Sequence, residues 1–305
     1  MWQDDHDPTG PTEPSPRAAN RRPKVQGDEG ATMPGDDEVV RVGLAGLGAI
    51  GEVLLERLGE DGSRHRVTAV CARREDRARK LLDSFGSDAA VVAPEDLGDH
   101  ADVIVEAVPA ALLRQVVKPA LERRRDVMVL SCGALLDNWD LVELAEHHGG
   151  RIHVPTGALL GLDAVQAAAQ GNVTSIRMIT RKPPRTLAGT PHVEEHGIDL
   201  DSLTEPLLLF KGSPREAIVG FPANLNVAVA LSLAGIGPDD TQLEVWADPS
   251  VQRNTHHIEV ESDSAHLNFS IENIISDLNG RTGRITPLSV LALLKKLDSH
   301  LRIGT

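Results

Sequence analysis

Apolar strand patterns and amphipathic helical patterns alternate along the chain from residue 39 to about residue 155. Val39–Ala45 is an apolar run typical of a buried strand, and residues 52–58 follow it with helical spacing. Further strand patterns lie at 67–71, 102–105, 126–130 and 151–154, and helical patterns at 75–85, 110–121 and about 138–147. This alternation predicts a doubly wound parallel sheet of the Rossmann type, which binds ligands at the carboxyl ends of its strands.

The pattern changes after residue 155. Helical patterns lie at 157–170, 223–234 and 287–297, and strand patterns at 175–181, 241–247, 255–262 and 265–272. Consecutive strands with short connections predict a mostly antiparallel sheet. We therefore predict an α/β chain with a nucleotide-binding domain at 39–155. An α+β domain at 156–305 would provide substrate binding, catalysis and dimerisation, with its closing helix packed back on the nucleotide domain.

Residues 1–38 differ in composition from the rest of the chain. They contain six Pro, four Gly and no Ile, Leu or Phe, with nine acidic against four basic residues. Such a segment buries too little apolar surface to offset its chain entropy, so we predict a disordered tail. Met33, just before the first strand, offers an alternative start of translation.

Charge and cysteine content narrow the function classes. The formal net charge of −14 disfavours nucleic acid and anionic membranes as partners. No uncharged apolar run reaches about 18 residues, so we predict no membrane-spanning helix. Cys71 and Cys132 are too far apart in sequence to form a CxxC pair, and we predict neither a disulfide framework nor a metal site. Two isolated cysteines suit the reducing cytoplasm.

A glycine-rich motif joins the first strand to the first helix. It reads Gly46-Leu47-Gly48-Ala49-Ile50-Gly51 and has the strand-turn-helix context that a dinucleotide site requires. The first glycine permits the tight turn, the second lets the pyrophosphate approach the backbone, and the third lets the helix pack closely. The helix N-terminus adds N–H donors for the phosphates. The motif therefore predicts a site for NAD or NADP.

The end of the second strand bears on the choice of cofactor. An NAD site usually has an acidic residue there for the ribose 2′-hydroxyl, whereas this chain has Arg73 and Arg74. Two guanidinium groups suit a 2′-phosphate, which predicts that NADP is accepted. Alternatively, the two arginines only stand at the start of a solvent-exposed helix and do not contact the cofactor.

One histidine stands out by its position in a strand pattern. Residues 255–261 alternate with a period of two, which places His256 on the face of Ile258 and Val260. His257 then lies on the opposite, polar face. An inward histidine is either a core residue or a catalytic base, and apolar surroundings would lower its pKa and keep it neutral.

Several longer motifs resemble the L-aspartate dehydrogenase family, in order and from about Val39 to Leu297. They are Gly46–Gly51, Leu130–Leu135, Val154–Ala158 with Gly161–Asp163, Thr180–Pro184, Phe221–Val227, and Ala247–Pro249 with Asn254–His256. The resemblance implies NAD(P)-dependent oxidative deamination of L-aspartate to iminoaspartate or oxaloacetate and ammonia, or the reverse amination. It also implies a homodimer and a role in NAD biosynthesis.

The resemblance assigns roles to individual residues. It implies that His256 is the catalytic residue and that Ala158 and Asn226 contact the cofactor. Asn224 is either a helix cap or a residue that positions nicotinamide and substrate. The substrate carboxylates need cations, for which Lys182, Arg185, Arg253 and Arg281 are candidates. The family usually has Asn-Pro-Lys-Thr-Ser where this chain has Asn279-Gly280-Arg281-Thr282-Gly283, and this difference bears on substrate identity.

Two other functions are compatible with the same domain plan. A sugar or polyol oxidoreductase typically uses the lysine of a Glu-Lys-Pro segment, but the corresponding residues 106–109 contain no lysine. A non-catalytic NAD(P)-binding regulator would keep the fold without the chemistry. The retained His256 argues against this alternative, whereas the altered loop at 279–283 leaves it open.

Overall fold

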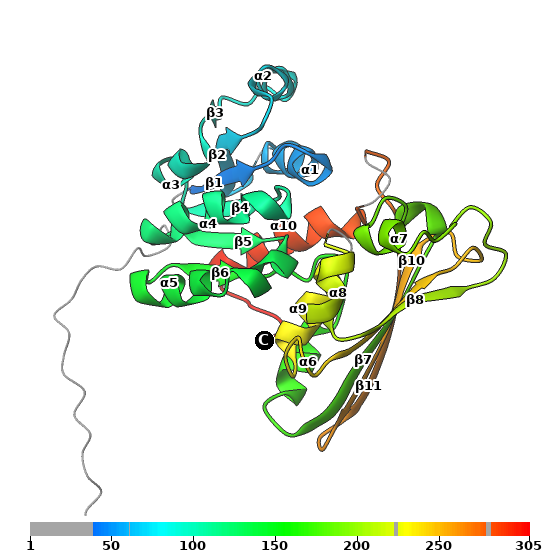
Figure 1. Ribbon diagram of the computed structural model, residues 1–305. Coiled ribbons are helices and arrows are strands. Elements are labelled where there is room, and N and C mark those ends of the chain that lie inside the picture. The colour runs from blue at the N-terminus through cyan, green and yellow to red at the C-terminus, as the bar shows by residue number, and fades with distance from the viewer. Residues whose placement is uncertain (1–38, 61, 223–224, 279–281) are drawn as a thin grey trace, which may run out of the picture. The chain divides into compact units, whose positions relative to one another are not determined.

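The computed structural model describes residues 39–60, 62–222, 225–278 and 282–305 (Figure 1). The predicted tail, with Met33, lies outside these ranges, as do Asn224 and Arg281. None of the helices in the described ranges has the length and apolarity that crossing a membrane requires.

The first half of the described chain forms a six-stranded parallel sheet in the order β3-β2-β1-β4-β5-β6. Its strands are β1 (Val40–Ala45), β2 (His65–Cys71), β3 (Ala90–Val91), β4 (Val103–Glu106), β5 (Asp126–Val129) and β6 (Arg151–His153). The connecting helices are α1 (Ala49–Leu58), α2 (Glu75–Ser84), α3 (Leu97–His100), α4 (Leu113–Glu122) and α5 (Asp140–His148). The predicted doubly wound sheet is confirmed.

The second half builds a five-stranded sheet in the order β11-β10-β7-β9-β8. The strands are β7 (Val173–Lys182), β8 (Leu207–Gly212), β9 (Gln242–Ala247), β10 (Asn254–Ser262) and β11 (His266–Asn273). Its helices are α6 (Leu162–Ala168), α7 (Pro191–Glu195), α8 (Pro214–Gly220), α9 (Asn226–Ala234) and α10 (Ile285–Asp298). Only β7 and β9 pair in parallel, so the mostly antiparallel sheet is also confirmed.

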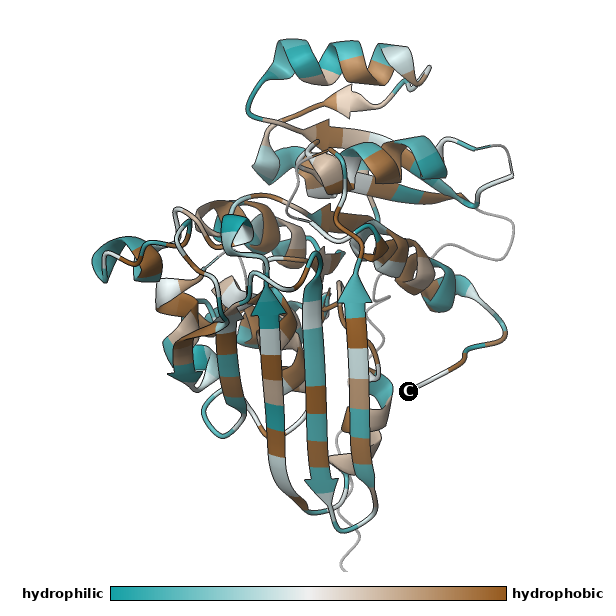
Figure 2. Ribbon diagram, turned by 90° about the vertical axis from the view of Figure 1, so that its right-hand side faces the viewer, coloured by the Kyte–Doolittle hydropathy of each residue, from teal (hydrophilic) through white to brown (hydrophobic). Residues whose placement is uncertain are grey.

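The second sheet buries one face against helices. Burial alternates along β10, and hydrophobic and hydrophilic bands alternate along the strands in Figure 2. Ile176 of β7 and Ile258 of β10 share an apolar cluster with Val165 of α6 and Leu231 of α9. The same cluster includes Val129 of β5, so the core is continuous between the two sheets. This shared core fixes the ends of both sheets around a common site.

Helix α10 packs on the nucleotide-binding half. Val290 and Leu294 of α10 belong to the apolar cluster that contains Leu54 of α1 and Val42 of β1. The helix, orange-red in Figure 1, runs beside the first sheet. The chain therefore returns from the second sheet to the first at its C-terminal end, while the exact domain boundary at residue 155 stays a prediction.

Part of the predicted helix at 157–170 was wrong, because α6 begins only at Leu162. Gly157 and Gly161 have φ angles of +62° and +69°, which a right-handed helix does not accommodate. A Cβ on Gly161 would also lie 2.9 Å from the ring of Phe269. The chain therefore turns twice here, which brings Ala158 close to the second sheet.

Candidate active site

The glycine motif forms a shaped cradle after β1. A Cβ on Gly46 would lie 2.6 Å from the carbonyl oxygen of Ala107, and one on Gly51 would lie 2.1 Å from that of Gly46. Gly48 has no atom within 4 Å of such a Cβ. The backbone is therefore tightly packed where the strand, the turn and the helix meet. At the middle glycine, by contrast, there is free space beside the backbone. Ala49 begins α1 at this opening, so the residues fit the pyrophosphate of NAD or NADP.

A cavity of about 770 Å³ extends from this cradle toward the end of β2. Arg73 and Arg74 line it with Gly46 and Gly48, and both arginines are exposed. The structure thus brings the two predicted arginines to the place where the ribose of a dinucleotide would lie.

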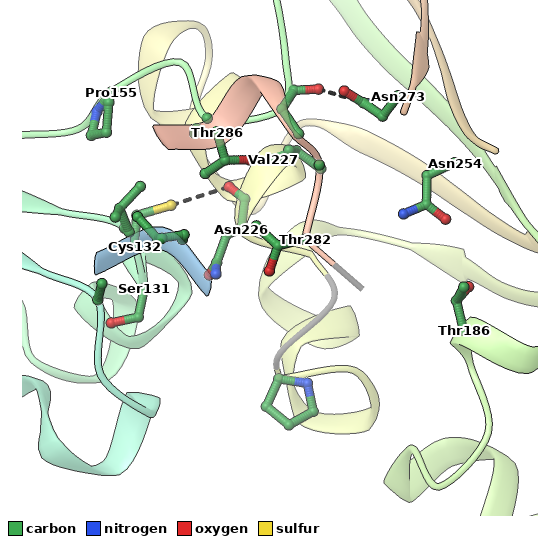
Figure 3. Close-up of a pocket in the computed structure, with 18 of the residues that line it drawn as sticks. Ser131, Cys132, Pro155, Thr186, Asn226, Val227, Asn254, Asn273, Thr282 and Thr286 are labelled. Carbon is green, nitrogen blue, oxygen red and sulfur yellow. Dashed lines mark hydrogen bonds between the residues drawn. The ribbon is translucent and has the colours of Figure 1, made fainter. Parts of the chain in front are cut away.

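A second cavity of about 360 Å³ lies between the carboxyl ends of β4 and β5 and one end of the second sheet (Figure 3). Ile50, Ser131 and Ala158 line it from the N-terminal side of the chain. From the C-terminal half it is lined by, among others, Lys182, Asn226, Asn254, His256 and Asn273. Polar groups of both halves therefore meet beside the nucleotide cradle.

His256 is the central titratable group of this cavity. It lies on the inner face of β10 with 2% of its surface exposed, in agreement with the strand register. Its Nδ1 hydrogen-bonds to Oγ1 of Thr180 on β7 at 2.8 Å. Burial, and to a lesser extent the charge of Lys182, lowers the pKa of His256 to about 3. The ring is therefore neutral at pH 7, and with Nδ1 held, Nε2 can exchange a proton with a ligand.

Lys182 places a positive charge in this cavity. It ends β7, lines the same cavity and is 5% exposed. Burial lowers the pKa of its ammonium group to about 8. Lys182 is therefore largely protonated at pH 7 and suited to bind a carboxylate.

The inner wall of the cavity is held by hydrogen bonds at the strand ends. Glu106, fully buried at the end of β4, accepts from the backbone N–H and hydroxyl of Ser131 at 3.1 and 2.8 Å. Asn226 Oδ1 accepts from the backbone N–H of Gly133 at 3.0 Å, and the Cys132 thiol donates to the Asn226 carbonyl oxygen at 3.1 Å. Burial raises the pKa of Cys132 to about 12, so this thiol is a structural donor rather than a nucleophile.

Two of the four predicted cations lie away from the cavity. Arg185 and Arg253 are exposed and do not line it, whereas Lys182 does. Arg185 lies within the short 3-10 turn Pro184–Thr186, and Arg253 directly precedes β10. Asn224 and Arg281 lie outside the described residues. In the described ranges, no cluster of three or more His, Cys, Asp or Glu side chains is placed to hold a metal ion.

Sequence reasoning missed three polar residues of the site. Thr180 contacts His256 only through the pairing of β7 with β10, which local sequence does not reveal. Asn254 shares the face of His256 two residues away, so the strand period carried a usable signal. Asn273 ends β11 and donates from Nδ2 to the carbonyl oxygen of Ala158 at 2.9 Å, a contact across 115 positions.

Family models match most of the described chain. Residues 46–155 match the model described as homoserine dehydrogenase, NAD binding domain, which confirms the predicted NAD(P) cofactor. Residues 163–297 match the model described as aspartate dehydrogenase, C-terminal.

Curated and solved relatives agree with these matches. L-aspartate dehydrogenase 3 of Bordetella bronchiseptica is 53% identical over 269 residues, 88% of this chain and 98% of that protein. The L-aspartate dehydrogenase of Bradyrhizobium diazoefficiens is 50% identical over 286 residues, 94% of this chain and 100% of that protein. The crystal structure of an aspartate dehydrogenase from Thermotoga maritima, 24% identical, shares the fold with a TM-score of 0.65 and covers 87% of this chain and 99% of that one. The chain belongs to the L-aspartate dehydrogenase family.

Proposed function

We propose that this protein is an L-aspartate dehydrogenase. It interconverts L-aspartate with iminoaspartate, and so with oxaloacetate and ammonia, using NAD or NADP. The observation that carries the proposal is the cavity beside the nucleotide cradle, where a neutral histidine and a protonated lysine are both buried. The relatives that are 50–53% identical to this chain are named L-aspartate dehydrogenases, which supports the same substrate.

His256 acts as the general base. Deamination requires that the substrate ammonium loses a proton before its nitrogen can form a double bond to Cα. Nε2 of the neutral ring takes that proton, while Thr180 fixes the ring through Nδ1. Bound NAD(P) supplies hydride transfer to or from the substrate α-carbon. A positioned base of this kind contributes about 10²–10⁴-fold to the rate.

Lys182 binds a substrate carboxylate, and other residues of the cavity position the nicotinamide ring of the cofactor. The protonated amine of Lys182 offers three donors inside a buried site, where a charge-assisted hydrogen bond is stronger than in water. Asn226 and Ala158 line the same cavity, and the family resemblance assigns them contacts with the cofactor. Asn224 and Arg281 complete the proposed substrate contacts by the same resemblance.

The two arginines after β2 favour NADP. We expect Arg73→Ala combined with Arg74→Ala to raise KM for NADP about tenfold or more, because each guanidinium group forms a charge-assisted contact with the 2′-phosphate. KM for NAD should change little, since NAD has no such phosphate. Initial rates at varied concentrations of each cofactor test this. An equal rise for both cofactors would show that the arginines do not distinguish them.

The outer face of the second sheet is the proposed dimer interface. On this face the guanidinium group of Arg181 lies 4.8 Å from the centre of the Trp246 ring on β9. Strand pairing places Ile179 of β7 and Leu208 of β8 on the same face, and Leu208 is 38% exposed. A second copy of the chain would cover these apolar groups. Sedimentation should give a dimer for the wild type and a monomer for Trp246→Glu, and a monomeric wild type at micromolar concentration would contradict the interface.

We also propose that the protein acts in the cytoplasm. Both cysteines are buried as free thiols, which is the state that a reducing compartment maintains.

A panel of amino acids tests the proposed function. Reduction of NADP or NAD should be fastest with L-aspartate and at least about 100-fold slower with D-aspartate, L-asparagine or L-alanine, which lack either the configuration or the second carboxylate. Reduction with a polyol such as inositol, and none with L-aspartate, would show that the protein is instead a polyol oxidoreductase. No reduction with any substrate would favour the non-catalytic regulator.

A further inference from the structure

Two buried amide oxygens in the cavity have no hydrogen-bond donor among the described residues. They are Oδ1 of Asn254 and Oδ1 of Asn273, in side chains that are 8% and 3% exposed. Nearly all buried polar atoms in folded proteins are paired, because an unpaired one destabilises the folded state. Two such atoms in one site therefore point to a ligand that donates hydrogen bonds.

The two asparagines are neighbours by strand register. Asn254 begins β10 and lies directly opposite Asn273, which ends β11, in the antiparallel ladder. Both asparagines line the cavity (Figure 3). The alternating burial along β10 places Asn254 on the same strand face as His256. The two acceptors therefore lie on the same side of the cavity as the general base.

The chemistry of the cavity separates two kinds of ligand group. A carboxylate needs donors, and Lys182 provides them. An amine in its ammonium form has three N–H bonds and needs acceptors. Neutral His256 and the two amide oxygens are three acceptors on neighbouring positions of one sheet face.

We propose that Asn254 and Asn273 form the amine-binding subsite, an inference that rests on the proposed dehydrogenase function. The substrate ammonium transfers one proton to Nε2 of His256, and the N–H bond electrons stay on nitrogen as a lone pair. The two remaining N–H groups donate to the two amide oxygens. With these two N–H groups held, the lone pair forms the C=N bond as the Cα–H bond breaks. The electron pair of that bond would leave as hydride to bound NAD(P), which leaves a C=NH2+ group. In the reverse direction the same oxygens hold incoming ammonia.

Asn254 is the better residue to test, because Asn273 also supports Ala158 through its Nδ2. Asn254→Leu keeps a similar volume and removes the acceptor. We expect KM for ammonia in oxaloacetate amination, and KM for L-aspartate, to rise roughly tenfold or more. The inhibition constant of succinate, a dicarboxylate without an amine, should stay within about twofold. Asn268→Leu, at an exposed position on β11, is the matched control and should leave all three constants unchanged.

Asn254→Asp provides an independent measurement, also if Asn254→Leu folds poorly. It retains an acceptor oxygen, so KM for ammonia should stay within about threefold of wild type, while KM for oxaloacetate rises through charge repulsion. If the inhibition constant of succinate rises in Asn254→Leu as much as KM for ammonia does, Asn254 binds a carboxylate. A lower Tm with unchanged kinetics would show that it only supports the fold. Either result overturns the subsite. If wild-type protein shows no ammonia-dependent oxidation of NAD(P)H, the proposed function itself fails, a result distinct from both.

Discussion

Replacement of His256 by alanine should lower kcat for L-aspartate by about 100-fold or more, which is the usual contribution of a general base. KM for NADP and Tm should stay close to wild type, since the imidazole contacts the substrate side of the cavity. Steady-state kinetics and thermal unfolding measure these quantities. His257→Ala is the matched control, because His257 lies on the opposite face of β10, where it pairs with Glu259.

Two outcomes would contradict a catalytic His256. In the first, stability falls by a kcal/mol or more while kcat per folded molecule stays intact, as for a core histidine. In the second, both histidine variants lose the same activity.

The pH profile of the wild type gives an independent check on this residue. In the free protein burial and Lys182 lower the pKa of His256 to about 3, so kcat/KM should not fall with the ordinary histidine pKa near 6.5. Bound substrate brings two carboxylates close to the ring, and their negative charge raises its pKa. The acid limb of kcat, which reports the substrate complex, should therefore lie at higher pH than that of kcat/KM.

Lys182→Met should raise KM for L-aspartate and oxaloacetate about 100-fold, equivalent to roughly 3 kcal/mol for a buried charged contact. KM for NADP should not change. The wild-type KM for the dicarboxylate should rise as pH increases through about 8, where Lys182 loses its proton, and this dependence should vanish in the variant. Lys118→Met, at an exposed position on α4, is the control. If KM for the dicarboxylate still rises above about pH 8 in Lys182→Met, a group other than Lys182 causes this pH dependence.

The parallel sheet was predictable because its central strands β1, β4 and β5 are buried on both faces and read as mostly apolar runs. The second sheet was also visible, through the period of two along β10. Edge strand β8 was missed, because its exposed leucines give no alternation that marks a core face. The start of α6 was misplaced because Gly157 and Gly161 have positive φ angles, and Gly161 packs against Phe269, a residue distant in the sequence.

The candidate site was partly predictable for the same physical reasons. Local patterns identified the glycine cradle and the inward face of His256. Lys182 lines the cavity and Arg185 and Arg253 do not. This difference depends on where β7 ends and β10 begins relative to the cavity. The contacts of Thr180 and Asn273 arise from strand register between segments far apart in the chain, and periodicity within one segment does not contain that information.

The most direct test of the proposed function is NADPH oxidation by the wild-type protein with oxaloacetate, measured with and without ammonium chloride. We predict oxidation that depends on ammonia and yields L-aspartate as the product. Oxidation at the same rate without ammonia would mean reduction to a hydroxy acid, and this result would contradict an amino-acid dehydrogenase.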